Sequence, residues 1–218
     1  MVLEADPYFF LSLQQTIEMA LKTFVKINQV SSLSDARYCA GMGVDVLGFS
    51  LVEGTPSYVD PQQFKEITQW VSGPQFAGEF GSASVDQIKL ATVDYAIDFI
   101  ETSDPDHLEV LADLDIPIIL KFAMSSSADF GKLNEIFSFG GDLLQYLHLE
   151  ISTSLLEEHT STLSQLKKPL IMNVDQPTTN LDLISQFGIS LTAQQEAQTG
   201  LQDYGEIMDV LEELEIEN

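Results

Sequence analysis

Short apolar runs alternate with amphipathic stretches along almost the whole chain, and this alternation constrains the fold most. The clearest unit, residues 26–49, holds a short apolar run, a polar loop, a helical stretch and a second, near-continuous apolar run. The helical stretch begins after Ser32 or Ser34 and stops at Gly41 or Gly43. Serine caps helix N-termini, glycine ends helices, and a nearly all-apolar run suits a covered parallel strand. The segment therefore predicts a strand–helix–strand unit.

The same unit is repeated along the rest of the chain. Strands that alternate with helices predict a parallel sheet. Right-handed connections and a count of eight favour closure into an α/β barrel, the (βα)8 TIM barrel, as a single domain. The expected strands cover residues 23–28, 44–51, 75–81, 94–100, 116–122, 143–150, 169–174 and 188–192, and the expected helices cover 32–42, 60–71, 84–92, 105–113, 126–138, 154–166, 177–187 and 203–214.

The front of the chain does not fit the repeat, and Asp6-Pro7 is a turn signal. We expect residues 1–20 to be an N-terminal extension and residues 21–218 to be the barrel. No apolar run reaches the ~18–20 residues of a membrane span, and acidic residues flank the apolar stretch 8–11, unlike a signal peptide. The single cysteine, Cys39, excludes an internal disulfide, which is consistent with a cytoplasmic location.

The charge balance is strongly acidic. Nine Lys and Arg residues face 34 Asp and Glu residues, a formal net charge of -25. Nucleic acid and anionic membrane surfaces are therefore not expected as partners. A solvated acidic surface explains most of this charge, but it also attracts anionic substrates poorly unless basic groups gather locally.

Polar residues of mixed charge stand at the carboxyl ends of the expected strands, where barrel enzymes place their active sites. They predict a lined pocket, with a solvated mouth without ligand as the alternative. Lys26 and Lys121 are expected either to form an internal ion-pair network or to provide an anion or Schiff-base site. No clustered metal-ligand spacing is present, so we expect no metal and no cofactor. The expected pocket residues are Lys26, Gln29, Ser57, Glu79, Asp98, Glu101, Lys121 and His148.

The opening motif resembles that of phosphoribosylanthranilate isomerase. It comprises Val25-Lys26-Ile27-Asn28-Gln29-Val30-Ser31, Gly43-Val44-Asp45 and Leu47-Gly48-Phe49. Weaker collinear matches are Pro56-x-Tyr58-Val59, Gly78-x-Phe80 and Glu196-x-x-x-Gly200-x-x-Asp203, so the similarity runs from about residue 23 to 214. The resemblance implies a (βα)8 barrel and an Amadori rearrangement in tryptophan biosynthesis.

The departures from this family concentrate on its chemistry. Asn28 stands where the family has its general base, a cysteine, and Glu150 stands where it has its general acid, an aspartate. Ser57 replaces an arginine, and Gln29 replaces a glycine. An amide cannot act as a base near neutrality, and a Cβ obstructs the approach of backbone N–H groups to a phosphate. The family's glycine-rich phosphate loops correspond to Asn173, Val174, Thr192, Ala193 and Gln194.

These losses predict a degenerate relative without isomerase activity, either a pseudoenzyme or a binder of another small molecule. One alternative is a divergent but active isomerase that uses Glu150 as its acid. Another is a barrel enzyme of changed chemistry that uses Lys26, Lys121 and the surrounding carboxylates. We expect a small-molecule ligand as partner, and a monomer or a homodimer.

Overall fold

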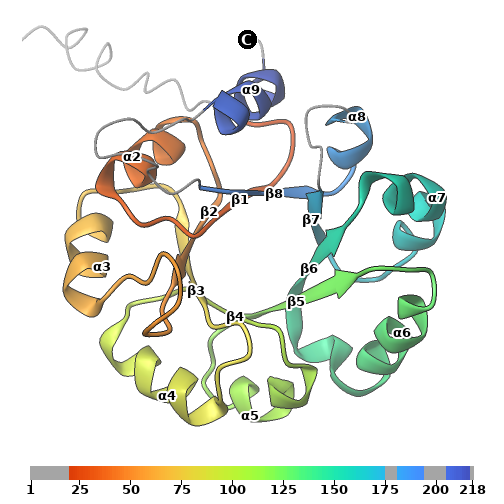
Figure 1. Ribbon diagram of the computed structural model, residues 1–218, viewed down its shortest axis with the longest axis horizontal. Coiled ribbons are helices and arrows are strands. Elements are labelled where there is room, and N and C mark those ends of the chain that lie inside the picture. The colour runs from red at the N-terminus through yellow and green to blue at the C-terminus, as the bar shows by residue number, and fades with distance from the viewer. Residues whose placement is uncertain (1–19, 175–180, 194–204, 217–218) are drawn as a thin grey trace, which may run out of the picture.

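The computed structural model describes residues 20–174, 181–193 and 205–216, and it confirms the predicted barrel. Parallel strands pair in chain order and the last pairs with the first, which closes the sheet (Figure 1). The strands are β1 (Val25–Asn28), β2 (Val46–Ser50), β3 (Gln75–Glu79), β4 (Phe99–Thr102), β5 (Ile118–Met124), β6 (Leu144–Ile151), β7 (Leu170–Val174) and β8 (Gly188–Thr192).

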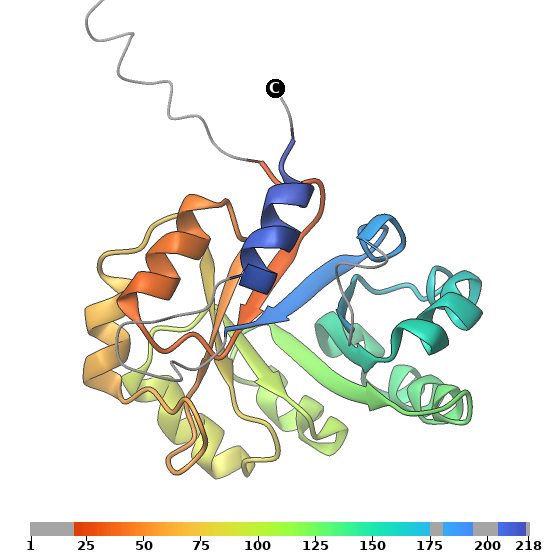
Figure 2. The ribbon, with the colours of Figure 1, turned by 45° about the horizontal axis from the view of Figure 1, so that its top comes forward.

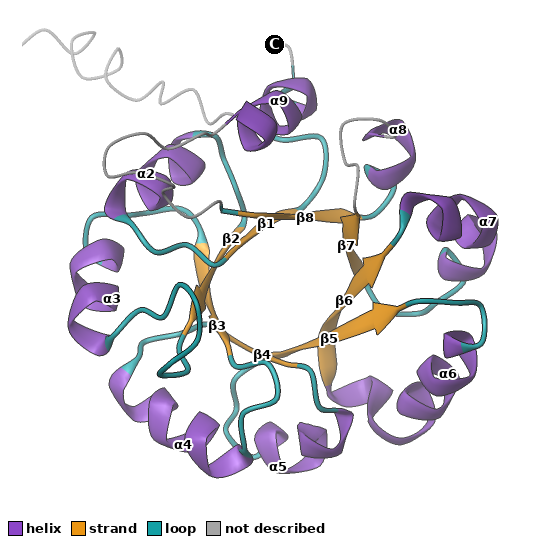
Figure 3. Ribbon diagram, in the orientation of Figure 1, coloured by secondary structure: helices purple, strands orange, loops and turns teal. Residues whose placement is uncertain are grey.

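Helices surround the barrel (Figure 3). Several begin where the sequence places a capping side chain: Ser32, Asp60 and Ser152 each accept a hydrogen bond from a backbone N–H of the first turn, and Ser84 forms a capping box with Gln87. The helical elements are α2 (Leu33–Gly41), α3 (Pro61–Thr68), α4 (Val85–Asp94), η1 (Pro105–His107), α5 (Leu108–Ala112), α6 (Asp129–Gly140), η2 (Gly141–Leu143), α7 (Thr153–Leu163), α8 (Leu181–Ile184) and α9 (Gly205–Leu214).

The fourth strand is the main correction to the predicted elements. The sequence predicts it at residues 94–100, but β4 covers Phe99–Thr102. Tyr95 and Ile97 alternate like strand residues, yet Tyr95 caps the end of α4 and its hydroxyl donates to the carbonyl of Val59 at 2.9 Å. Tyr95 and Ile97 alternate because both pack in the large apolar cluster, although they precede β4.

The core has two parts. A large apolar cluster fills the space between the strands and the helices, and it includes the inward face of the last helix with Val210, Leu211 and Leu214. A separate small cluster lies inside the barrel and is built from Val46, Ala77, Phe99 and Ile119, against which Phe24 and Tyr146 pack. The aromatic rings of Phe24 and Tyr146 stack at 4.8 Å.

The two ends of the described chain meet beside α9 (Figure 2). The Lys22 N–H donates to the carbonyl of Leu214 at 2.9 Å, and the Ile216 N–H donates to the carbonyl of Ala20 at 3.1 Å. Three predicted features lie outside the described residues. They are the N-terminal extension up to residue 19, the phosphate-loop residue Gln194, and the pattern from Glu196 to Asp203. Within the described ranges, no helix is long and apolar enough to cross a membrane.

Candidate binding site in the barrel mouth

Several strands that line the site change from apolar to polar along their inward face. Residues two apart on a strand share a face, so Phe99 and Glu101 point the same way on β4, as do Ile119 and Lys121 on β5. The apolar members belong to the small cluster inside the barrel. The polar members come later on each strand and therefore lie above that cluster, at the carboxyl-terminal end where parallel barrels carry their sites.

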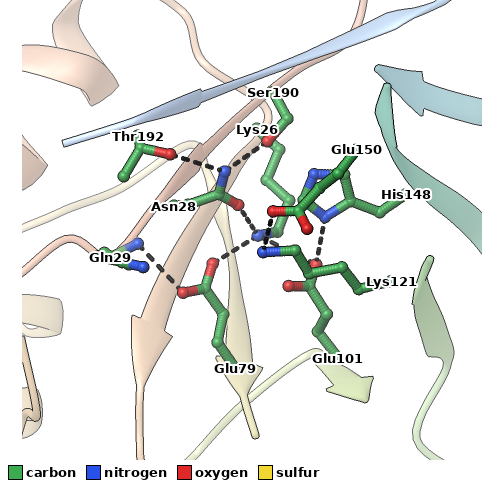
Figure 4. A network of polar contacts seen from close by, with 10 residues as sticks. All are labelled: Lys26, Asn28, Gln29, Glu79, Glu101, Lys121, His148, Glu150, Ser190 and Thr192. Carbon is green, nitrogen blue, oxygen red and sulfur yellow. Dashed lines mark hydrogen bonds and ion pairs between the residues drawn. The ribbon is translucent and has the colours of Figure 1, made fainter. Parts of the chain in front are cut away.

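Lys26 is the centre of a polar network in this mouth (Figure 4). Its side chain is fully buried, and its ammonium donates to Glu79 at 2.6 Å and to the amide oxygen of Asn28. A second carboxylate, that of Glu101, lies 3.2 Å from the same nitrogen. A buried charge is tolerated only when it is paired and hydrogen-bonded, and Lys26 meets both conditions.

The two carboxylates hold Lys26 in its charged form. Burial alone lowers the pKa of a lysine, but the charges of Glu101 and Glu79 outweigh it and raise the pKa of Lys26 above its usual value. Burial likewise opposes ionisation of Glu101, yet Lys26 and His148 hold the pKa of this carboxyl far below its usual range. This direction favours the ammonium form of Lys26 near neutrality, whereas a Schiff base needs the free amine.

His148 extends the network from β6 and leaves one polar atom unused. Its Nδ1 lies 2.9 Å from Glu101 Oε2, and because that oxygen belongs to a carboxylate, the proton of a neutral ring must sit on Nδ1. The other nitrogen, Nε2, then offers a lone pair. It is buried and has no hydrogen-bond partner among the described residues. Such an orphan calls for an explanation, and a donor from water or from a ligand would satisfy it.

Asn28, at the end of β1, is engaged on both sides of its amide. Its oxygen accepts from Lys26, and its NH2 donates to Ser190 at 2.6 Å and more weakly to Thr192 at 3.4 Å. This pattern assigns the orientation of the amide, because only the oxygen can accept from an ammonium. The side chain is buried and serves as a fixed bridge between β1 and β8.

A second ion pair lies closer to solvent. The Lys121 ammonium and Glu150 Oε1 are 2.7 Å apart, and their side chains are 26% and 43% exposed. Gln29 follows β1 in the left-handed region, with φ 57°, and its backbone N–H donates to Glu79 Oε2 at 3.2 Å. The structure therefore brings together eight of the predicted residues: Lys26, Asn28, Gln29, Glu79, Glu101, Lys121, His148 and Glu150 (Figure 4).

One predicted pocket residue lies elsewhere. Asp98 precedes β4, at the opposite end of the barrel, and its carboxylate accepts the backbone N–H of Phe76 at 2.7 Å. Its prediction as a mouth residue is wrong because the fourth strand begins later than expected. Ser57, with φ 60°, lies in the loop after β2, at the carboxyl-terminal end of that strand. Conversely, Ser190, which accepts from Asn28, was not predicted, because nothing in the sequence distinguishes it from the other serines.

The family's phosphate-loop positions are only partly described. Asn173 and Val174 end β7, Thr192 ends β8, and the Ala193 N–H donates to the carbonyl of Asn28 at 2.9 Å. That backbone donor is therefore already used within the barrel. Gln194 lies outside the described residues. Within the described part of the chain, no group of three or more His, Cys, Asp or Glu side chains is placed to hold a metal ion.

The network predicts how stability depends on pH. Because the pKa of Glu101 is lowered on folding, its contribution is present above the unfolded value of about 4.5 and is lost as pH falls. Because the pKa of Lys26 is raised, its contribution is present below 10.5 and is lost as pH rises through the folded value. We expect the stability difference between wild type and Glu101→Gln to shrink below pH 4.5, by up to about 1.4 kcal/mol per pH unit. Urea unfolding at a series of pH values measures it.

A matched control separates this effect from general acid unfolding. Glu135 is exposed on α6, so wild type and Glu135→Gln should keep a nearly constant stability difference over the same range. Parallel curves for Glu101→Gln and wild type would contradict the assignment of Glu101 as a buried carboxylate.

Comparison with known proteins relates the barrel to one group of enzymes. No family model and no curated protein sequence matches the chain. Among solved structures, phosphoribosylanthranilate isomerase from Thermotoga maritima has a TM-score of 0.68 and 17% identity over 87% of this chain and 97% of its own. The enzyme from Thermus thermophilus has a TM-score of 0.68 and 16% identity, over 88% and 98%. Another structure of this enzyme, in complex with reduced 1-(o-carboxyphenylamino)-1-deoxyribulose 5-phosphate, has a TM-score of 0.69 and 17% identity, over 87% and 97%. At these identities the similarity establishes a shared fold.

Proposed function

We propose that this chain is a phosphoribosylanthranilate isomerase-like barrel that has lost the isomerase reaction and binds a different small molecule at its mouth. The bonding of Asn28 carries this proposal. The reaction needs a base at this position, and a carboxamide has no basic pKa near neutrality. Its oxygen accepts from Lys26 and its nitrogen donates to Ser190, so the side chain works as a structural bridge.

The charges of the mouth also argue against the family's phosphorylated substrate. Two ammoniums, Lys26 and Lys121, face three carboxylates, Glu79, Glu101 and Glu150, so these five groups sum to -1. The ammonium of Lys26 is already shared by two of the carboxylates. A dianionic ester would have to displace one of these pairs, and the net charge of -25 provides no steering toward the site.

The ligand that fits is a small polar molecule that offers a hydrogen-bond donor. In the neutral form of its ring, His148 presents Nε2 as an acceptor without a partner among the described residues, and a hydroxyl or amine would satisfy it. We propose that the protein binds such a molecule in the cytoplasm, as a monomer or a homodimer. Burial raises the pKa of Cys39 to about 12, so this residue stays a thiol. A buried free thiol is compatible with a reducing compartment.

An active isomerase with Glu150 as its acid is less well supported. Glu150 stands at the family's acid position but is engaged by Lys121 at 2.7 Å, and it is one methylene longer than aspartate. A misplacement of about 1 Å costs on the order of 10²-fold in rate. Lys26, which is bonded to Asn28, does not supply the missing base, since it is held as an ammonium.

Complementation of a tryptophan auxotroph that lacks the isomerase tests the proposal. We expect no growth with the wild-type chain and none with Asn28→Cys, because a general base contributes about 10²–10⁴-fold and cannot by itself hold the substrate. A bona fide isomerase expressed from the same vector is the positive control, and immunoblotting confirms that each variant accumulates.

The two possible positive outcomes have different meanings. Growth with the unmodified chain would overturn the loss of isomerase activity. Growth with Asn28→Cys alone would keep Asn28 as the inactivating substitution but would show that the phosphate site is intact.

A further inference from the structure

The fifth helical segment covers the barrel poorly. In α5 only five residues are helical, against ten in α4 and twelve in α6. The outward side chain of Phe122 on β5 therefore lies at the bottom of a cavity of about 520 Å³ between α5 and α6. This cavity, named here the α5–α6 groove, is separate from the mouth, because the inward residues of β5 are Ile119 and Lys121. It is lined by Pro105, Asp106, Leu108, Glu109, Phe122, Lys132, Glu135, Ile136, Phe139 and Gly140.

The floor of the groove is apolar and one wall is exposed. Leu108 and Ile136 flank Phe122, and Phe139 stands at the wall with 81% of its surface exposed. Val110, on the outer side of α5, is 41% exposed. An apolar floor with a large exposed aromatic beside it is typical of a surface that is covered by a partner.

The rim of the groove is acidic. Asp106, Glu109 and Glu135 are exposed, and none of them has an ion pair in the described part of the chain. The single cation of the lining, Lys132, is paired with Asp129 at 2.8 Å. The uncompensated charge around the apolar floor is therefore negative.

We propose that the α5–α6 groove docks a cationic amphipathic segment of another protein, with apolar side chains over Phe122 and basic side chains facing the acidic rim. A channel between two helices suits an amphipathic helix laid into it. A second copy of this chain is the poorer occupant, since its net charge is also -25. Residues 1–19 are poorer as well, because they carry Glu4, Asp6 and Glu18 and no Lys or Arg.

Binding of a synthetic peptide tests this proposal. The probe is an amidated amphipathic peptide of about 14 leucine and lysine residues in helical spacing, measured by calorimetry at about 0.15 M salt. We expect a Kd on the order of 10 µM for the full chain, and binding at least about tenfold weaker for Glu109→Lys/Glu135→Lys. Phe139→Ser should weaken it by a similar factor, and because Phe139 is exposed, this variant should keep its fold.

The matched control carries the same change of charge on the other side of the barrel. Glu212→Lys/Glu213→Lys, two exposed residues of α9, should leave the affinity within about twofold. Equal weakening by both double variants would show attraction to net charge alone and overturn the proposal. Unchanged binding by Phe139→Ser would remove the apolar anchor and overturn it too. A concentration-dependent dimer that Phe139→Ser dissociates would assign the groove to a second copy instead.

Discussion

Lys26→Met is expected to lower the free energy of unfolding by about 3–5 kcal/mol. Methionine fills much of the space of the lysine stem but removes its ammonium. Glu79 and Glu101 then remain in the barrel without the cation that lies 2.6 and 3.2 Å from them. An uncompensated buried charge is expensive, and the amide oxygen of Asn28 loses its donor as well. Urea unfolding followed by circular dichroism at neutral pH measures the loss.

Lys132→Met is the matched control, since it removes an ammonium with a similar geometry in a different setting. Lys132 lies 2.8 Å from Asp129, but its side chain is 69% exposed. Water solvates this lysine, and Asp129 keeps the backbone N–H groups of Ser125 and Ser126 as donors, so the expected loss is much smaller than for Lys26→Met. Equal effects of the two substitutions would show that the interior network contributes no more than a surface pair.

A second substitution tests whether the carboxylates cause the loss. In Lys26→Met/Glu101→Gln one of the two stranded charges is gone, and the amide of glutamine still accepts from His148 Nδ1. We therefore expect the double variant to recover part of the stability lost in Lys26→Met. If the double variant loses the sum of the two single losses, the residues are not coupled.

The fold was predictable because two periods alternate along the chain. A period of two or a continuous apolar run marks strands, and helices begin at serine or aspartate caps. The error at residues 94–100 has the same origin, because Tyr95 and Ile97 mimic a strand while packing in the helix layer. Local patterns report burial, and burial alone does not say on which side of the sheet a residue lies.

The mouth was predictable to the extent that chemistry sits at strand ends. Lys26, Glu79, Glu101 and His148 were predicted as pocket residues in this way, and the observed polar network contains all four. The hydrogen-bond partners of each atom could not be predicted, because they come from strands that are far apart in the sequence. Ser190 accepts from Asn28 across 162 positions, and nothing near it in the sequence distinguishes it from other serines.

The role of Gly48 also could not be predicted, because its neighbours come from other strands. A Cβ on Gly48, in the middle of β2, would overlap Glu79 Oε1 and come within 2.8 Å of Lys26 Nζ. The glycine thus leaves the space in which the buried ion pair forms. We expect Gly48→Ala to destabilise the protein by about 2–4 kcal/mol, since overpacking alone costs about 1–3 kcal/mol and the displaced Glu79 weakens its pairing. Urea unfolding of the purified variant measures this loss.

Gly131→Ala provides the opposite expectation from the same chemical change. Gly131 lies within α6, and a Cβ there meets nothing within 4 Å. Alanine in the first turn of this helix should stabilise the protein by up to about 1 kcal/mol. The two variants should therefore move the urea midpoint in opposite directions. If Gly48→Ala leaves it unchanged, Glu79 moves aside at no cost, and its contact with Lys26 does not stabilise the mouth.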